Sequence, residues 1–132
     1  MSLNDEDRQI IVQMEMEKAE KTFSQSDILK QAQLWDTLAN RLYYSLFHAV
    51  SAILVKDHHE VGTHRGAVNR FHQYYVKPGL FSKEEGSFYS QMQSMREAGD
   101  YNCSFNVSEM DIVPRIEPTR PLINKIKKYI DQ

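Results

Sequence analysis

Two stripes of polar residues interrupt the apolar pattern of the chain where a helical core is expected. Arg41, Tyr44 and His48 are spaced by three and four residues, which places them on one face of a helix. A second stripe, spaced four, three and four, comprises Tyr89, Gln93, Arg96 and Asp100. A charged group away from water costs several kcal/mol unless it is paired. We therefore expect the two stripes to face each other.

A site built from these stripes carries two phenols and an excess of positive charge. Arg41 and Arg96 against Asp100 leave one positive charge, and more if His48 is protonated. Because guanidinium groups bind phosphate oxygens in a planar, bidentate geometry, this combination suits a phosphate or a ribose. Two alternatives need no ligand. The stripes could form a structural network that ties two helices together, or Arg96 and Asp100 could form a plain surface pair on one helix.

Helical periodicity covers most of the chain and predicts the elements that position these stripes. The clearest helix spans about 35–56, where apolar residues recur every three or four positions. Its apolar surface is wide, so we expect it at the centre of a bundle. The other predicted helices span about 4–30, 63 to the Pro78-Gly79 stop, 82–101, and a region from about 108 that its prolines interrupt or kink.

Residues with short polar side chains mark where these helices begin. Asn4, Thr63 and Ser82 are candidate N-caps, and Glu85 stands where a capping box needs its carboxylate. No repeat, low-complexity tract or linker divides the chain. The predicted fold is an all-α, up-and-down antiparallel bundle of about five helices, in a single domain over residues 1–132.

Composition and charge exclude several classes of function. The 132 residues carry a net charge of −2, which gives no general attraction for nucleic acid and no feature for reading DNA sequence. No stretch approaches a membrane span or a signal segment. The single Cys103 cannot form an internal disulfide, so the expected compartment is the cytoplasm.

The charge is nevertheless uneven along the chain. Residues 1–30 hold seven acidic and four basic groups, whereas residues 112–132 hold two acidic and five basic groups. This pattern fits two solvated helix faces, pairing between the terminal helices, or a basic edge. The basic edge would comprise Arg115, Arg120, Lys125, Lys127 and Lys128.

Metal and cofactor chemistry finds no support in the sequence. The five histidines lack the spacing of a zinc site, and neither a cysteine pair nor an H-E-x-x-H sequence occurs. The glycines do not form a phosphate-binding loop. Cys103 follows a predicted helix instead of opening one, so it has no nucleophile setting. We expect no metal and no cofactor.

Several motifs, in order and at fitting spacings, carry a resemblance to a known family. In chain order they are RLYYSLFHA at 41–49, THRG at 63–66, Phe71, YVK at 75–77, Gly79 and REAGDY at 96–101. The first is similar to an R-x-Y-Y-x-x-F-H-A core and the last to an R-E-x-A-D-Y segment. Over about residues 8–130 the chain resembles the HEPN proteins of bacteria and archaea, particularly their small stand-alone type.

This resemblance implies a fold, partners and an activity. HEPN proteins are five-helix, mostly antiparallel bundles that often form homodimers. They are commonly encoded beside a minimal nucleotidyltransferase in toxin–antitoxin pairs. Several are metal-independent endoribonucleases that carry R-x(4–6)-H late in the bundle, and two copies of this motif meet across the dimer.

The chain departs from that ribonuclease motif at its histidine. Arg96 supplies the arginine, but the positions for the histidine hold Tyr101, Asn102 and Cys103. Metal-independent RNA cleavage needs a base and an acid near pH 7, and a phenol with its ordinary pKa of about 10 is a poor base. His48 or His64 could replace the missing group only if folding brings one of them near Arg96.

We therefore predict a non-catalytic HEPN binding or interaction module. It would engage a nucleotide, RNA or a nucleotidyltransferase-type protein in a toxin–antitoxin-like context, as a homodimer. The alternative is a metal-independent endoribonuclease with a non-standard acid–base set of Arg96, Asp100 and His48. The predicted ligand-binding residues are Arg41, Tyr44, His48, Arg96, Asp100 and Tyr101.

Overall fold

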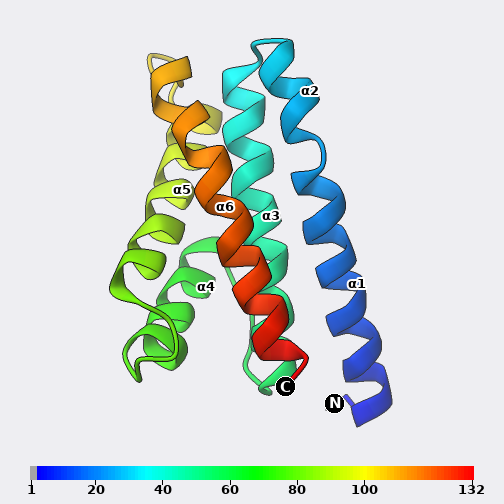
Figure 1. Cartoon of the computed structure of the whole chain (residues 1–132). Helices are drawn as coiled ribbons and strands as arrows, with labels where there is room; N and C mark the ends of the chain where they lie inside the picture. Colours follow the sequence, from blue (N-terminus) through cyan, green and yellow to red (C-terminus); the bar gives the residue numbers. More distant parts are fainter. Residues whose placement is uncertain (1–2) are drawn as a thin grey trace.

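The computed structural model describes residues 3–132, which form a helical bundle without strands among them. The all-α prediction is confirmed, and Figure 1 shows the long helices running up and down beside one another. In chain order the elements are α1 (Asp5–Phe23), α2 (Ser26–Gln31), α3 (Trp35–Lys56), α4 (His64–Phe71), the π-helical turn η1 (His72–Val76), α5 (Lys83–Tyr101) and α6 (Glu109–Ile130).

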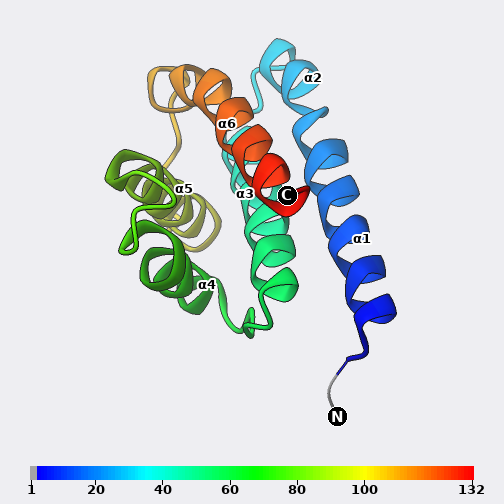
Figure 2. The same ribbon diagram turned by 60° about the horizontal axis from the view of Figure 1, so that its bottom comes forward.

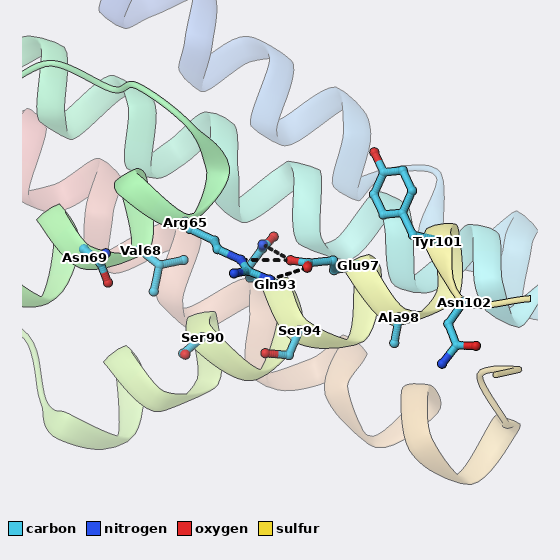
Figure 3. Close-up of a pocket in the computed structure, with 10 residues that line it drawn as sticks. All are labelled: Arg65, Val68, Asn69, Ser90, Gln93, Ser94, Glu97, Ala98, Tyr101 and Asn102. Carbon is cyan, nitrogen blue, oxygen red and sulfur yellow. Dashed lines mark hydrogen bonds and ion pairs between the residues drawn. The ribbon is translucent and has the colours of Figure 1, made fainter. Parts of the chain in front are cut away.

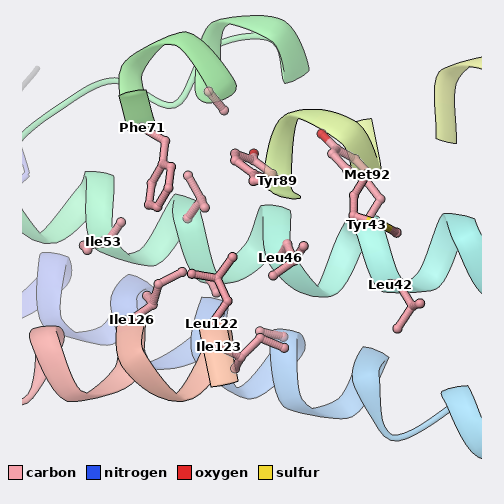
Figure 4. Close-up of a cluster of buried hydrophobic side chains, with 14 of the residues drawn as sticks. Leu42, Tyr43, Leu46, Ile53, Phe71, Tyr89, Met92, Leu122, Ile123 and Ile126 are labelled. Carbon is pink, nitrogen blue, oxygen red and sulfur yellow. The ribbon is translucent and has the colours of Figure 1, made fainter. Parts of the chain in front are cut away.

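Helix α3 is the central element, as its sequence predicts. It packs against α1, α5 and α6, and Figures 1 and 2 show it enclosed by these three helices. Leu42, Leu46 and Ile53 are fully buried on it. Figure 4 shows them facing the apolar side chains of α6 and of the α4–α5 half. Each fully buried leucine or isoleucine contributes about 1.5–3 kcal/mol to folding.

The helix predicted over residues 4–30 is wrong in one respect, because it consists of two helices. α1 ends at Phe23 and α2 begins at Ser26. Two serines mark the break: the Ser24 hydroxyl donates to the Lys21 carbonyl, and the Ser26 hydroxyl donates to the Phe23 carbonyl, both at 2.5 Å. Serine side chains that bond to nearby carbonyls compete with the helical ladder, and here they accompany the turn.

The last helix is continuous across its prolines. α6 contains Pro114, Pro118 and Pro121 without ending at any of them. Of the predicted interruption or kink, the interruption is therefore wrong, and the kink stays a prediction. Each proline removes one backbone donor, and the helix continues although these donors are missing.

The helix starts near the polar stripes are capped as predicted. Thr63 accepts a hydrogen bond from the Gly66 amide at 2.9 Å at the start of α4. Ser82 and Glu85 form the reciprocal capping box of α5. These caps fix where α4 and α5 begin, and thus the rotation of their side chains about the helix axes. Among residues 3–132, no helix is both long enough and apolar enough to span a membrane.

Candidate functional site

The polar stripes of α3 and α5 face each other through one asparagine. Arg41 donates from Nε and Nη2 to the Asn40 side-chain oxygen, at 3.0 and 2.6 Å. The Asn40 amide in turn donates to Asp100 of α5 at 3.0 Å. Asn40 therefore links the cation of one stripe to the carboxylate of the other, and it brings Arg41 and Asp100 into one network.

Arg96 is the centre of this site. Its side chain is 3% exposed, which makes it the most deeply buried charged group among residues 3–132. The guanidinium carbon lies 5.0 Å from the ring centre of Tyr43, 5.6 Å from that of Tyr101 and 5.9 Å from that of Tyr44. Cation–π attraction strengthens when the cation is desolvated, so three phenol rings partly offset the cost of burial.

The hydrogen-bonding capacity of Arg96 is only partly used. Nη2 donates to Gln93 at 3.0 Å, whereas Nη1 stands 3.7 Å from Asp100, beyond hydrogen-bond length. Nε is buried and has no hydrogen-bond partner among the described residues. The hydroxyl of Tyr89 is also buried without a partner. A buried donor without a partner costs about 1–3 kcal/mol, so the cluster is not saturated by the protein itself.

The remaining predicted ligand residues separate into those that join this cluster and one that does not. Tyr44 joins it, since the Arg41 guanidinium carbon also lies over its ring at 5.3 Å. Tyr101 joins it with a ring that is 77% exposed. The His48 ring lies 6.2 Å from that of Tyr44, between centroids, but its Nδ1 is 3.0 Å from Glu15 of α1. His48 therefore borders the cluster, with Nδ1 engaged by a different helix.

A histidine does lie against the tyrosine rings that surround Arg96, and it is His64 at the start of α4. Its Nδ1 is 2.7 Å from the hydroxyl of Tyr43, whose ring lies under Arg96. Its ring packs against Tyr43 and Tyr44, both at 5.5 Å between centroids. Burial and the positive charge of Arg96 lower the pKa of His64 below its ordinary value of 6.5. Folding thus brings an imidazole to the arginine, although not from the positions that follow it in the sequence.

An open cleft of about 530 Å³ adjoins the cluster between α4 and α5. Figure 3 shows the Arg65–Glu97 pair inside it and Tyr101 at the far end of α5. Gln93 joins cleft and cluster, because it accepts from Arg96 and donates to Glu97 at 2.9 Å. The full lining comprises Arg65, Val68, Asn69, Ser90, Gln93, Ser94, Glu97, Ala98, Tyr101 and Asn102.

The cleft carries one fixed ion pair. Arg65 donates to both carboxylate oxygens of Glu97, at 2.5 and 3.3 Å. The hydrogen bond from Arg65, together with the charges of Arg65 and Arg96, lowers the pKa of Glu97. The site contains three arginines and two carboxylates, so its net charge is one positive charge when His64 is neutral. These residues are Arg41, Arg65, Arg96, Glu97 and Asp100. Among residues 3–132, no three histidine, cysteine, aspartate or glutamate side chains gather as metal ligands do.

Sequence reasoning missed several members of this site. Neither Tyr43 nor Asn40 belongs to the two polar stripes, so helical spacing alone does not mark them. His64, Arg65 and Glu97 did have a signal, since they fall within the THRG and REAGDY motifs. The motifs therefore identified more of the site than the helical stripes did.

Comparison with known proteins places this site in a family. The family model of the HEPN domain matches residues 12–129, nearly the whole chain. The chain belongs to the HEPN family. The HEPN motifs at 41–49, 63–66 and 96–101 thus supply the Arg96 cluster, from α3, α4 and α5 respectively.

Relatives of this HEPN protein occur in a bacterium and in archaea. A UPF0332 protein of Thermotoga maritima is 27% identical over 125 residues, covering 95% of both chains. Two proteins of Methanocaldococcus jannaschii are each 25% identical. "Putative toxin MJ0142" is matched over 87% of this chain and 78% of its own, and "Putative toxin MJ0605" over 92% and 90%.

Proposed function

We propose that this HEPN protein is a toxin–antitoxin-type module whose Arg96 cluster binds a phosphate group of a nucleotide or an RNA. The observation that carries the proposal is the buried guanidinium of Arg96 with a donor that no described residue satisfies. A phosphate oxygen supplies the missing acceptor and the counter-charge together. Two relatives bear toxin names, which supports the toxin–antitoxin context.

The surroundings of Arg96 suit the rest of a nucleotide as well. Tyr101 presents a largely exposed ring at the edge of the cluster, and exposed aromatic rings stack on unpaired bases. The cleft between α4 and α5 offers polar side chains, including Asn69 and Ser94, beside the Arg65–Glu97 pair. Because the whole protein has a net charge of −2, binding would depend on this local site instead of a broad basic surface.

A binding titration tests the phosphate site. Fluorescence anisotropy with single-stranded RNA, and competition by AMP and by inorganic phosphate, would separate an RNA ligand from a free nucleotide. We expect Arg96→Met to weaken binding at least about tenfold, or about 1.4 kcal/mol. Arg120→Met removes an arginine that pairs with Glu20 on another face, so this control should bind like the wild type. Equal binding by both variants would refute the site.

A metal-independent endoribonuclease is the second candidate function. The specific observation in its favour is the position of His64 beside the rings that hold Arg96. Its predicted acid–base set included His48, but that ring is bound to Glu15. Incubation of RNA with the wild-type protein in EDTA tests this candidate, and cleavage that Arg96→Met abolishes would establish it. Binding without cleavage would leave the binding module as the function.

The protein partners predicted from the HEPN resemblance are part of the proposal. A nucleotidyltransferase-type protein encoded beside this one would be its partner, and co-expression followed by co-purification tests that pairing. For the homodimer, Tyr101 at the site and Met110 at the start of α6 are 77% and 86% exposed. Sedimentation velocity at several concentrations would show whether two copies associate and whether Met110→Ser prevents it.

A further inference from the structure

Helix α1 carries exposed apolar side chains on the face that it turns away from the bundle. Ile10 and Met14 are 50% and 61% exposed, and Leu3, just before the helix, is 42% exposed. Among residues 3–132, Ile10 and Met14 are the only exposed large apolar residues that lie one turn apart on the same helix. The opposite face of α1 is buried and packs on α3. A helix that packs on one side only has no need of a second apolar face.

This outer face of α1 lies far from the candidate site. Figures 1 and 2 show α1 at one side of the bundle, with α4 and α5 at the opposite side. The Arg96 cluster is built from α3, α4 and α5, so the phosphate site does not account for Ile10 and Met14. Adjacent exposed apolar residues of this kind mark surfaces that bind another protein.

The charges on the outer face of α1 have opposite signs at its two ends. Asp7 belongs to an acidic first turn, and Lys21 lies in the last turn. Asp7, Ile10, Met14 and Lys21 are spaced by three, four and seven residues, so they share one face of the helix. Neither Asp7 nor Lys21 forms a salt bridge with the described residues. Both charges are therefore free to pair with another molecule.

We propose that two copies of this chain bind each other through α1, in antiparallel orientation and about a two-fold axis at Met14. Residues equally far before and after Met14 then lie opposite one another. Asp7 and Lys21 are each seven residues from Met14, so they form two identical pairs of opposite charge, one at each end of the interface. Ile10 lies opposite Lys18, whose aliphatic stem covers apolar surface, and Met14 packs on the partner's Met14.

The charge pattern selects this orientation over a parallel one. Parallel pairing would set the two acidic first turns against each other and Lys21 against the partner's Lys21, and like charges that face each other across an interface are costly. In the antiparallel register, Glu17 stands opposite Ile11 and not opposite another carboxylate. The outer face of α1 is thus complementary to itself, as a two-fold interface requires.

This interface goes beyond the proposed function and does not depend on the phosphate site. The dimer implied by the HEPN resemblance joins two copies of the motif at Arg96. Pairing through α1 instead leaves both Arg96 clusters outside the interface, because α4 and α5 lie on the other side of the bundle. Each copy therefore keeps an open site.

Sedimentation velocity of the full chain at several concentrations tests the interface. We expect the wild type to dimerise reversibly. Met14→Glu places two carboxylates at the two-fold axis and should weaken the dimer at least about tenfold. Ile28→Glu makes a similar change at an isoleucine of α2 that is 71% exposed, so this control should associate like the wild type. Met110→Ser, on another face, should also have no effect.

Charge reversal tests the register. Asp7→Lys sets two lysines against each other at both ends of the interface, and we expect it to weaken the dimer about fivefold to tenfold. Adding Lys21→Asp restores opposite charges at the same two places, so the double variant should associate within about threefold of the wild type. Circular dichroism shows that each variant keeps its helices.

A covalent cross-link measures the axis independently. Met14→Cys is combined with Cys103→Ser, since Cys103 is free and exposed. The axis brings position 14 of the two copies together, so mild oxidation should give a disulfide-linked dimer, whereas Ile28→Cys in the same background should not. A wild type that stays monomeric, a dimer that Met14→Glu leaves intact, or one that Met110→Ser prevents would overturn the proposal. Loss of phosphate binding with an intact dimer would refute the phosphate site alone.

Discussion

The bundle contains two clusters in which tyrosines surround one charged group. They differ in whether other residues of the protein provide hydrogen-bond partners for all the polar atoms of the cluster. At the C-terminal end of α3, the Asp57 carboxylate accepts hydrogen bonds from the hydroxyl of Tyr75 at 2.8 Å and from that of Tyr129 at 2.9 Å. At the Arg96 cluster, Arg96 Nε and the Tyr89 hydroxyl are buried without partners. Buried donors are normally paired, and two of the four buried side-chain atoms without partners among residues 3–132 lie in the Arg96 cluster. This difference supports the proposed ligand site at Arg96.

The largest expected effect on stability comes from breaking the saturated cluster. Asp57→Ala leaves the Tyr129 hydroxyl without its acceptor, and the hydroxyl of Tyr75, which is 1% exposed, keeps only the Ile53 carbonyl at 3.0 Å. Because a buried group that loses its partner costs about 1–3 kcal/mol, we expect a loss of about 2 kcal/mol in the free energy of unfolding. Urea denaturation measures this loss. The exposed Asp131→Ala should change stability by less than about 0.5 kcal/mol.

The opposite result is expected at the unsaturated cluster. Arg96→Met exchanges a partly satisfied buried charge for an apolar side chain of similar length, a change that is often neutral or stabilising. We expect the free energy of unfolding to change by less than about 1 kcal/mol, while phosphate binding falls at least about tenfold. A loss of stability as large as that of Asp57→Ala, with binding unchanged, would make the Arg96 cluster a structural tie between α3 and α5.

The sequence predicts part of this arrangement because helical periodicity and the cost of burying charge act locally. Arg41, Arg96 and Asp100 could be placed in one cluster on those grounds, and their network through Asn40 agrees with that placement. The bounds predicted for α3 and α5 also match. The Ser82–Glu85 capping box marks the start of α5, and the apolar periodicity alone marks the extent of α3. These features depend on residues close together in the chain.

Other features depend on contacts that no local pattern encodes. His64 reaches Arg96 only because the loop after α3 turns back over Tyr43, and His48 turns away because α1 presents Glu15. Either histidine could have filled the position on sequence grounds. The break between α1 and α2 likewise coincides with two serine-to-carbonyl bonds, and α6 continues through its prolines.

A moderate effect is expected from the loop that positions His64. Alanine favours a helix over glycine by about 1 kcal/mol, but a Cβ at 66 would stand 2.7 Å from Arg70 Nη1 and 2.9 Å from Thr63 Oγ1. We expect Gly66→Ala to lose about 1 kcal/mol in unfolding free energy. Adding Arg70→Met removes the closest contact, so the double variant should recover part of the stability. If the double variant recovers no stability, the contact that destabilises Gly66→Ala is the one between the new Cβ and Thr63 Oγ1.

The smallest expected effect is a pH dependence that distinguishes the two clusters. The pKa of His64 in the folded protein lies below 6.5, so between these values the unfolded chain binds a proton that the folded chain does not. The contribution of neutral His64 to the free energy of unfolding is therefore fully present above about pH 6.5. It is lost as the pH falls from 6.5 through the pKa of His64 in the folded protein. We expect the urea midpoint of the wild type to decline between pH 7 and pH 5. The decline should be shallower for His64→Asn, whereas Tyr129→Phe should keep the wild-type slope, since it alters only the Asp57 cluster. Equal slopes in the wild type and His64→Asn would mean that His64 is solvated like a surface histidine, and the Arg96 cluster would then lose its neutral imidazole.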